Sequence, residues 1–174
     1  MARRGVTVLW CSLFVVVVAS ANWLTATYGL IGGWVAAGTF TAGLALAVRD
    51  AVRETAGIGA SVACIAVGAA VSAVMAGPVL ALASGAAFGL SELADTVVYE
   101  PLRRRGRVRA LAWSNLVGSV VDSVLFLTLA GFPVWPAVLG QVAVKWAVCV
   151  ALPVAVWGVV SRAVLRDRVR PAGP

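Results

Sequence analysis

Residues that could do chemistry stand inside an apolar stretch near the middle of the chain, LASGAAFGLSELAD, which runs from Leu82 to Asp95. Ser84 lies among small residues, a setting in which a serine can act as a nucleophile if a base is near. Glu92 and Asp95 are one helical turn apart, so both would face the same side of a helix. The stretch therefore allows two interpretations, a catalytic serine or a helix whose acids face a polar cavity.

The catalytic interpretation requires a base that takes the proton of the serine hydroxyl. ASGAAFG resembles the serine turn of rhomboid intramembrane proteases, in which that base is a histidine, but this chain has no histidine and a single lysine, Lys145. The cysteines Cys11, Cys64 and Cys149 lie in different apolar runs without CxxC spacing, so neither a disulfide set nor a metal site is expected. We expect a protein that is not an enzyme and that holds no cofactor or metal.

Polar and aromatic residues follow helical spacing in several apolar segments of the chain. They are Phe88, Glu92, Asp95 and Tyr99 on one face, Asn115, Ser119, Asp122 and Phe126 on a second, Gln141 and Lys145 one turn apart, and the single residues Asn22 and Asp50. An ionisable group at the depth of a bilayer is costly, and it usually faces a cavity or a charged partner. The pattern therefore indicates a polar interior shared by several helices.

The depths of these residues suggest which of them form ion pairs. At about 1.5 Å of rise per residue, Asp122 and Lys145 come to similar levels, so an ion pair between them is allowed, either as a structural pair or as part of a ligand site. Asp50 and Glu54 lie near a helix end, where neighbouring arginines can neutralise them. Glu92 and Asp95 have no basic residue at their estimated depth, so we expect them to line a polar cavity.

Composition identifies the class of protein. The chain has 174 residues, of which 61% are hydrophobic and 12% charged, whereas soluble domains carry about 25% charged residues. This predicts an all-α integral membrane protein with one domain over residues 1–174. A bilayer-crossing helix needs about 20 apolar residues, and six segments qualify, at about 6–25, 34–54, 57–76, 78–100, 109–131 and 136–163.

The basic residues predict the orientation of these spans. With six spans, every arginine cluster falls on one side, and the segments near 26–34, 76–78 and 131–136 contain no lysine or arginine. The positive-inside rule then places both termini in the cytoplasm, in a multi-pass protein of the cytoplasmic membrane. The same placement explains the net charge of +7 without nucleic acid. A second interpretation of residues 1–21 is a secretory signal cleaved after Ala21.

Four stretches on different spans carry a resemblance to a known family. They are GTFTAGLALAVRD ending at Asp50, ASGAAFGLSELAD ending at Asp95, WSNLVGSVVDSVLF around Asp122 and VKWAVCVALP from Lys145. In this order they resemble the putative vitamin uptake transporter family, also called the queuosine precursor transporters. The resemblance implies a six-helix fold similar to the substrate-binding subunits of energy-coupling-factor transporters.

The resemblance also implies a substrate and a set of binding residues. The substrate would be 7-cyano-7-deazaguanine or a related 7-deazapurine, and by position the candidate residues are Asn22, Asp50, Ser84, Glu92, Asp95, Asn115, Ser119, Asp122 and Lys145. A guanine-like edge presents two N–H donors that one carboxylate can accept. We expect Glu92 or Asp95 to supply that carboxylate, and Phe88, Phe126 or Trp146 to stack on the ring.

Two alternatives to a self-contained importer stay open. One is a vitamin-type substrate-binding subunit of an ATP-driven transporter, and the other is a small membrane protein without a transport role. The sequence has no nucleotide-binding loop, so any use of ATP would come from a partner ATPase module. A homo-oligomer is also left open. The small residues Ala66, Ala69, Ala70 and Ala73 permit helix docking, and ordinary packing accounts for them equally well.

Overall fold

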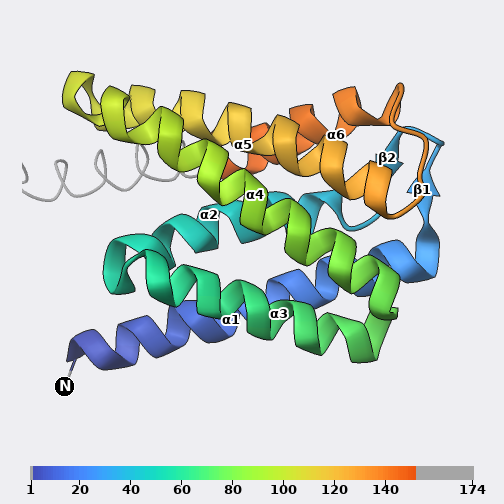
Figure 1. Cartoon of the computed structure of the whole chain (residues 1–174), viewed down its shortest axis with the longest axis horizontal. Helices are drawn as coiled ribbons and strands as arrows, with labels where there is room; N and C mark the ends of the chain where they lie inside the picture. The colour runs from blue at the N-terminus through green and yellow to red at the C-terminus, as the bar shows by residue number, and fades with distance from the viewer. Residues whose placement is uncertain (1, 152–174) are drawn as a thin grey trace, which may run out of the picture.

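The computed structural model describes residues 2–151, which form a bundle of helices with one short hairpin. In chain order the elements are α1 (Ala2–Tyr28), β1 (Leu30–Ile31), β2 (Val35–Ala36), α2 (Thr39–Ala56), α3 (Ile58–Ala76), α4 (Pro78–Leu102), the 3₁₀ turn η1 (Arg103–Arg105), α5 (Arg107–Leu129), α6 (Ala137–Trp146) and the π-helical turn η2 (Ala147–Ala151). Successive helices run up and down the long axis of the molecule (Figure 1). The helical class expected from the sequence is therefore confirmed.

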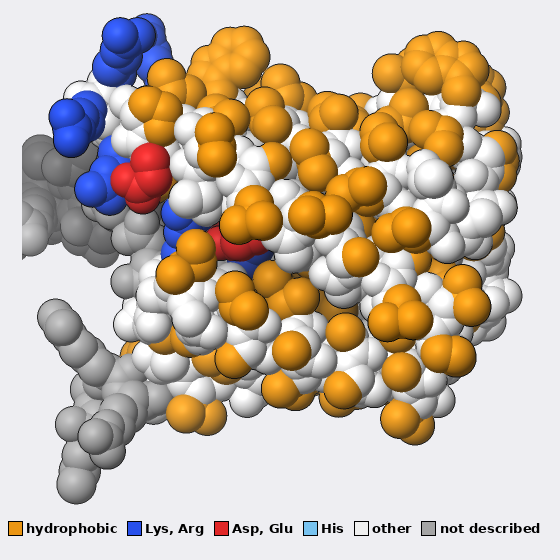
Figure 2. All heavy atoms as spheres, viewed as in Figure 1, with side chains coloured by type: hydrophobic (Ala, Val, Ile, Leu, Met, Phe, Trp, Pro, Cys, Tyr) orange, Lys and Arg blue, Asp and Glu red, His pale blue; other side chains and the backbone are white. Residues whose placement is uncertain are grey.

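The two ends of the bundle differ in composition. One end, called here the arginine end, holds the start of α1, the α2–α3 connection and η1 (Figure 1). The opposite end, called the hairpin end, holds β1 and β2, the α3–α4 connection and the α5–α6 connection. On the face shown in Figure 2, the basic side chains gather at the arginine end and hydrophobic side chains cover most of the rest.

Helix α2 lies at the centre of the packing. It contacts α1, α3, α6 and η2, whereas α4 packs chiefly against α5 and α3. A single glycine joins α3 to each neighbour, Gly57 before it and Gly77 after it. Gly77 has a φ of 89°, a conformation that costs other residues energy, and Pro78 follows as the first residue of α4, where its missing N–H is not needed.

The structure corrects the second predicted span. Residues 34–38 are not helical, because Leu30–Ile31 and Val35–Ala36 pair as an antiparallel hairpin in which Leu30 lies opposite Ala36. Helix α2 begins only at Thr39. The sixth predicted span, 136–163, is described as α6 and η2 up to Ala151, and its remainder lies outside the described residues.

Three of the described helical segments are long and apolar enough to cross a membrane, namely Gly5–Tyr28, Ile58–Ala76 and Val108–Leu129. The apolar segment Ala137–Val150 is shorter. The charged side chains of α2 and α4 lower the apolar character of these two helices. The structure thus supports a multi-pass membrane protein, and the number of six spans stays a prediction.

The interior holds many polar and charged side chains beside its apolar core, and large apolar side chains lie on the surface. Large aliphatic side chains such as Val74, Val97 and Leu82 are 73–89% exposed. Arg49, Glu92 and Lys145, in contrast, are almost fully buried. Soluble proteins bury such charges only rarely, so this distribution is typical of a bundle that faces lipid outside and a polar site inside.

Candidate functional site

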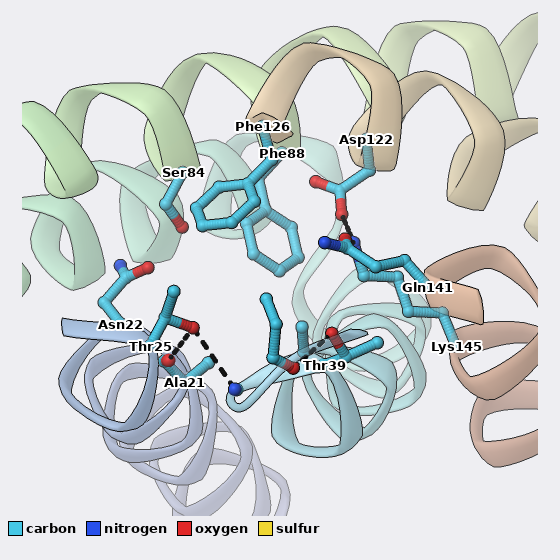
Figure 3. A pocket seen from close by; sticks show the side chains of 13 residues that line it. Ala21, Asn22, Thr25, Thr39, Ser84, Phe88, Asp122, Phe126, Gln141 and Lys145 are labelled. Atoms are coloured by element: carbon cyan, nitrogen blue, oxygen red, sulfur yellow. Dashed lines mark hydrogen bonds and ion pairs between the residues drawn. The ribbon is translucent and has the colours of Figure 1, made fainter. Parts of the chain in front are cut away.

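A cavity lies between α1, α2, α4, α5 and α6, towards the hairpin end (Figure 3). The space between its atoms, about 320 Å³, includes open solvent at its mouth. The cavity is narrow, because the centre of a water molecule has only about 20 Å³ in which to move. The lining residues are Ala21, Asn22, Thr25, Ala36, Gly38, Thr39, Ala42, Ser84, Phe88, Asp122, Phe126, Gln141 and Lys145. We call this cavity the central pocket.

The charged pair in the central pocket is Asp122 of α5 with Lys145 of α6. Lys145 Nζ lies 2.6 Å from Asp122 Oδ2, and it also donates to Ser123 Oγ at 3.1 Å and Gln141 Oε1 at 3.2 Å. The ion pair expected from the estimated depths is confirmed. An ammonium has three N–H donors, and all three are used here, so Lys145 orients its neighbours and has no donor left for a ligand.

Asp122 keeps one oxygen available. Its Oδ2 is held by Lys145, and its second oxygen points into the pocket (Figure 3). Within residues 2–151 no hydrogen bond to this second oxygen is present. A buried carboxylate fixed by an ion pair on one side presents a strong acceptor on the other.

Two amide groups add unpaired donors to the same wall. Gln141 Oε1 accepts a hydrogen bond from Lys145. Neither Gln141 Nε2 nor Asn22 Nδ2 has a hydrogen-bond partner within the described part of the chain. Both residues are at most 2% exposed. A buried donor without a partner costs about 1–3 kcal/mol, so the pocket is arranged for a molecule that brings acceptors.

Aromatic rings complete the pocket. Phe88 of α4 and Phe126 of α5 point into the space between Asn22 and Asp122 (Figure 3). Phe14 packs edge-on against Phe88, with ring centroids 5.9 Å apart, and holds that ring in place. Trp146, the third ring considered for stacking, does not line the pocket, because its Nε1 donates to the carbonyl of Ala112 on the side of α5.

At the hairpin end of the pocket, two threonine hydroxyls form hydrogen bonds with backbone groups. Thr25 Oγ1 donates to the carbonyl of Ala21 at 2.9 Å and accepts from the Gly38 N–H at 3.2 Å. Thr39 Oγ1 donates to Ala36 O at 2.6 Å. Thr25 and Thr39 were absent from the residues predicted to bind substrate, although their hydroxyls within apolar segments could have indicated them.

We predict that Gly38→Ala destabilises the protein. An alanine Cβ at this position would lie 2.7 Å from Thr25 Oγ1 and closer still to the Ala21 carbonyl, so α1 and α2 would have to move apart. Overpacking of this kind costs about 1–3 kcal/mol, which corresponds to roughly 3–10 °C in the unfolding temperature. Thermal unfolding of the purified protein measures this, with Gly59→Ala as control because nothing lies within 4 Å of its Cβ. Equal unfolding temperatures for the two variants would contradict the prediction.

A second group of buried charges lies nearer the arginine end. It consists of Arg49, Asp50 and Arg53 on α2, Glu92 and Asp95 on α4, and Asn115 on α5, and we call it the charged cluster.

The guanidinium groups of the charged cluster bridge α2 to α4. Arg49 Nε lies 2.8 Å from Glu92 Oε2, and Arg49 Nη2 lies 3.6 Å from Asp95 Oδ1. Arg53 Nη1 lies 3.1 Å from Asp95 Oδ2 and 3.5 Å from Glu92 Oε1. The expectation that Glu92 and Asp95 lack a basic partner is therefore wrong. The long arginine side chains reach inward from the end of α2, which an estimate based on the backbone position does not capture.

Asp50 and Asn115 link the cluster to α5. Arg49 donates to Asp50 Oδ1 from Nη2 at 2.9 Å, and Asn115 Nδ2 donates to Asp50 Oδ2 at 3.0 Å. The neutralisation of Asp50 by Arg49 is thus confirmed. The side chain of Glu54 lies outside what the structure describes.

The predicted site residues therefore divide into two groups. Asn22, Ser84, Phe88, Asp122 and Lys145 line the central pocket. Asp50, Glu92, Asp95 and Asn115 belong to the charged cluster, and Ser119 is buried on α5 one turn from Asn115. The expectation of a single shared pocket is wrong.

Apolar side chains lie between the two groups on the α2 side. On α2, Leu46 stands between the pocket residue Ala42 and Arg49 of the cluster. Leu46 packs with Phe14, Phe88 and Cys149 in one buried core. Asp50, Glu92 and Asp95 do not line the pocket.

Comparison with known proteins identifies the family. No curated protein and no solved structure matches the chain. A family model described as "Putative vitamin uptake transporter" matches residues 72–158, half of the chain, including α4, α5 and α6. This segment carries Asp122, Gln141 and Lys145 of the central pocket. The chain belongs to the putative vitamin uptake transporter family.

Proposed function

We propose that the protein imports a 7-deazapurine with a guanine-like edge, such as 7-cyano-7-deazaguanine, and that the central pocket binds it. The family and the apolar helices indicate a vitamin-type uptake transporter with a small-molecule substrate and a non-enzymatic role. One observation carries the proposed substrate, namely the position of the Asp122 carboxylate. Its Oδ2 accepts a hydrogen bond from Lys145, and its other oxygen faces the pocket.

The chemistry of the pocket fits such a substrate. A guanine-like edge offers two adjacent N–H donors, and a carboxylate accepts both because each of its oxygens has two lone pairs. Asp122 Oδ2 can hold Lys145 and still accept from the ligand. The edge of the base that carries acceptors would take the free donors of Asn22 and Gln141, and Phe88 and Phe126 would stack on its faces.

Asp122 replaces Glu92 and Asp95 as the acid expected to hold the base. The latter two are paired with Arg49 and Arg53, whereas Asp122 faces the open space of the pocket. Since that space is narrow, a bound base would push the side chains of Phe88 and Phe126 apart. The pocket described here is therefore a contracted form of the site.

We propose six crossings of the cytoplasmic membrane, with the arginine end and both termini in the cytoplasm. The helices alternate in direction (Figure 1), and Arg103, Arg104 and Arg105 form the connection η1 at the arginine end. This is the arrangement that the positive-inside rule favours. The buried charges of α2 and α4 are compatible with a crossing because they are paired within the bundle.

Equilibrium binding to the purified protein tests the proposal. We expect saturable binding of labelled 7-cyano-7-deazaguanine and competition by guanine-like bases. Adenine-like bases should compete at least about tenfold more weakly, because they offer Asp122 no pair of N–H donors. This difference corresponds to a loss of at least about 1.4 kcal/mol of binding free energy. Absence of saturable binding, or equal competition by both classes of base, would refute the substrate assignment.

A further inference from the structure

The charged cluster holds one more carboxylate than it has guanidinium groups. Arg49 and Arg53 face three carboxylates, those of Asp50, Glu92 and Asp95. Of the neighbouring charged groups, Glu100 is 49% exposed, and it pairs with Arg103 at 3.2 Å and with Arg53 Nη2 at 3.8 Å. Lys145 pairs with Asp122 in the central pocket. Counted over the side chains that the structure describes, the interior of the cluster therefore carries one unit of negative charge, which a bound cation or proton would neutralise.

The hydrogen bonds locate this surplus charge at Glu92. Asp50 accepts hydrogen bonds from Arg49 Nε, Arg49 Nη2 and Asn115 Nδ2, and Asp95 Oδ2 accepts one from Arg53 Nη1. Neither oxygen of Glu92 has a hydrogen-bond partner within the described residues. Its closest cation, Arg49 Nε, directs its N–H to Asp50, so Glu92 is held by charge alone. Of the three acids, it loses the fewest hydrogen bonds when it takes up a proton.

Besides the oxygens of Glu92, further buried polar atoms of the cluster have no hydrogen-bond partner within the described residues. Asn115 is 2% exposed, and its Oδ1 accepts no hydrogen bond from any described residue, while its Nδ2 is fixed on Asp50. In the cluster as a whole, Glu92 Oε1 and Oε2, Asp95 Oδ1 and Asn115 Oδ1 are acceptors without a partner, and Arg49 Nη1 is a donor without one. Because the unpartnered acceptors outnumber the unpartnered donor, the cluster favours a species that brings a proton. Among the described residues no group of acids, cysteines or histidines has a geometry for a metal ion.

The surroundings of Glu92 offer a route for this proton. The charged groups that face it are Arg49, Asp50 and Arg53 from α2 and Asp95 from α4. Helix α5 adds the uncharged side chain of Asn115 to the cluster, and η2 adds Cys149 beside Asp50. A groove of about 260 Å³, lined in part by Asp50, Arg53 and Asp95, lies next to the cluster. Arg53 and Asp50, whose side chains are 17% and 21% exposed, connect the groove with the buried carboxylates.

We propose that Glu92 is a proton-binding site that couples import of the substrate to the proton gradient. The proposal rests on the transport function argued above. A proton passes from a hydronium ion to a carboxylate oxygen of Glu92, which forms an O–H bond and releases water. The neutral acid no longer attracts Arg49 and Arg53, so the bridge between α2 and α4 weakens. Glu92 lies one helical turn from Phe88 of the central pocket, which connects this change to the substrate site.

Infrared spectroscopy of the lipid-reconstituted protein tests proton binding without any substrate. In the wild type we expect a carboxylic acid C=O band that appears reversibly on acidification. Glu92→Gln should lack this band, and the protein should still fold, because the amide has the shape of the protonated acid and removes the surplus charge. Glu100→Gln, the same change at an exposed acid of α4, should keep it. Identical acidification spectra for the wild type and Glu92→Gln would overturn the proposal.

Transport in proteoliposomes tests the coupling. An imposed proton gradient should raise the initial uptake of labelled 7-cyano-7-deazaguanine about fivefold or more in the wild type and in Glu100→Gln. Glu92→Gln should lose this stimulation and keep the exchange of internal for external substrate. Uptake that ignores the gradient in the wild type, or that still responds to it in Glu92→Gln, would overturn the proposal. Absence of both uptake and exchange in the wild type would refute the substrate assignment, and the infrared result would still decide the role of Glu92.

Discussion

Replacing Asp122 with asparagine is expected to weaken binding of 7-cyano-7-deazaguanine about a hundredfold, because the charged acceptor for the guanine-like edge is lost, at a cost of about 3 kcal/mol. The same change leaves the ammonium of Lys145, which is 2% exposed, without its ion-pair partner. Titration of the purified variant with labelled substrate measures the loss. An unchanged dissociation constant would remove Asp122 from the site.

A double variant separates a binding role of Asp122 from a structural one. Asp122→Asn combined with Lys145→Gln removes both charges, so no unpaired ammonium is left in the interior. The thermal stability lost in Asp122→Asn should then be recovered in large part. Binding should stay about a hundredfold weak, because the acceptor for the base is still missing. If the double variant regains full affinity, the pair serves only to hold α5 against α6.

The second large effect is expected at Arg49. This side chain is fully buried and faces Asp50, Glu92 and Asp95. Arg49→Met would leave these acids with Arg53 as the one cation of the cluster, and removing one partner of a buried ion pair costs about 3–5 kcal/mol. The unfolding temperature should fall by roughly 10 °C or more, as measured by thermal unfolding in detergent.

Two further variants make this prediction specific. Arg103→Met removes an arginine that is 56% exposed and paired with Glu100, and it should cost less than about 1 kcal/mol. Arg49→Met combined with Glu92→Gln removes one positive and one negative charge, and it should be more stable than Arg49→Met alone. The buried network would not have the role assigned to it if Arg49→Met and Arg103→Met unfolded at the same temperature.

The sequence predicted the helices well and the hairpin poorly. Long apolar runs define α1, α3 and α5 because their length and composition match a bilayer. Residues 34–38, WVAAG, are as apolar as a helix, so hydropathy extended the second span through them. Their conformation is decided by pairing of Val35 with Ile31 across a turn, and a scale of apolarity contains no information on such pairing.

The contents of the site were predicted more successfully than its arrangement. Asp122 and Lys145 were matched because the rise per residue brings their helix positions to similar depths, and their side chains meet at 2.6 Å. The partners of Glu92 were missed because the reach of an arginine side chain is comparable to the spacing between helices. The division into the central pocket and the charged cluster was also missed, since it depends on tertiary contacts of α2 with α4 and α5, which spacing along one helix does not reveal.

The one-residue connections at Gly57 and Gly77 restrict how the bundle can move. A one-residue connection holds the ends of the two helices that it joins at a nearly fixed distance. Sliding of α2 along its axis relative to α3, or of α3 relative to α4, would therefore break the connection's geometry. Rotation about the backbone of each glycine stays free. If the bundle opens, α2 and α4 would then rotate as rigid helices about Gly57 and Gly77, at the two ends of α3, while the length of α3 keeps these two points a fixed distance apart.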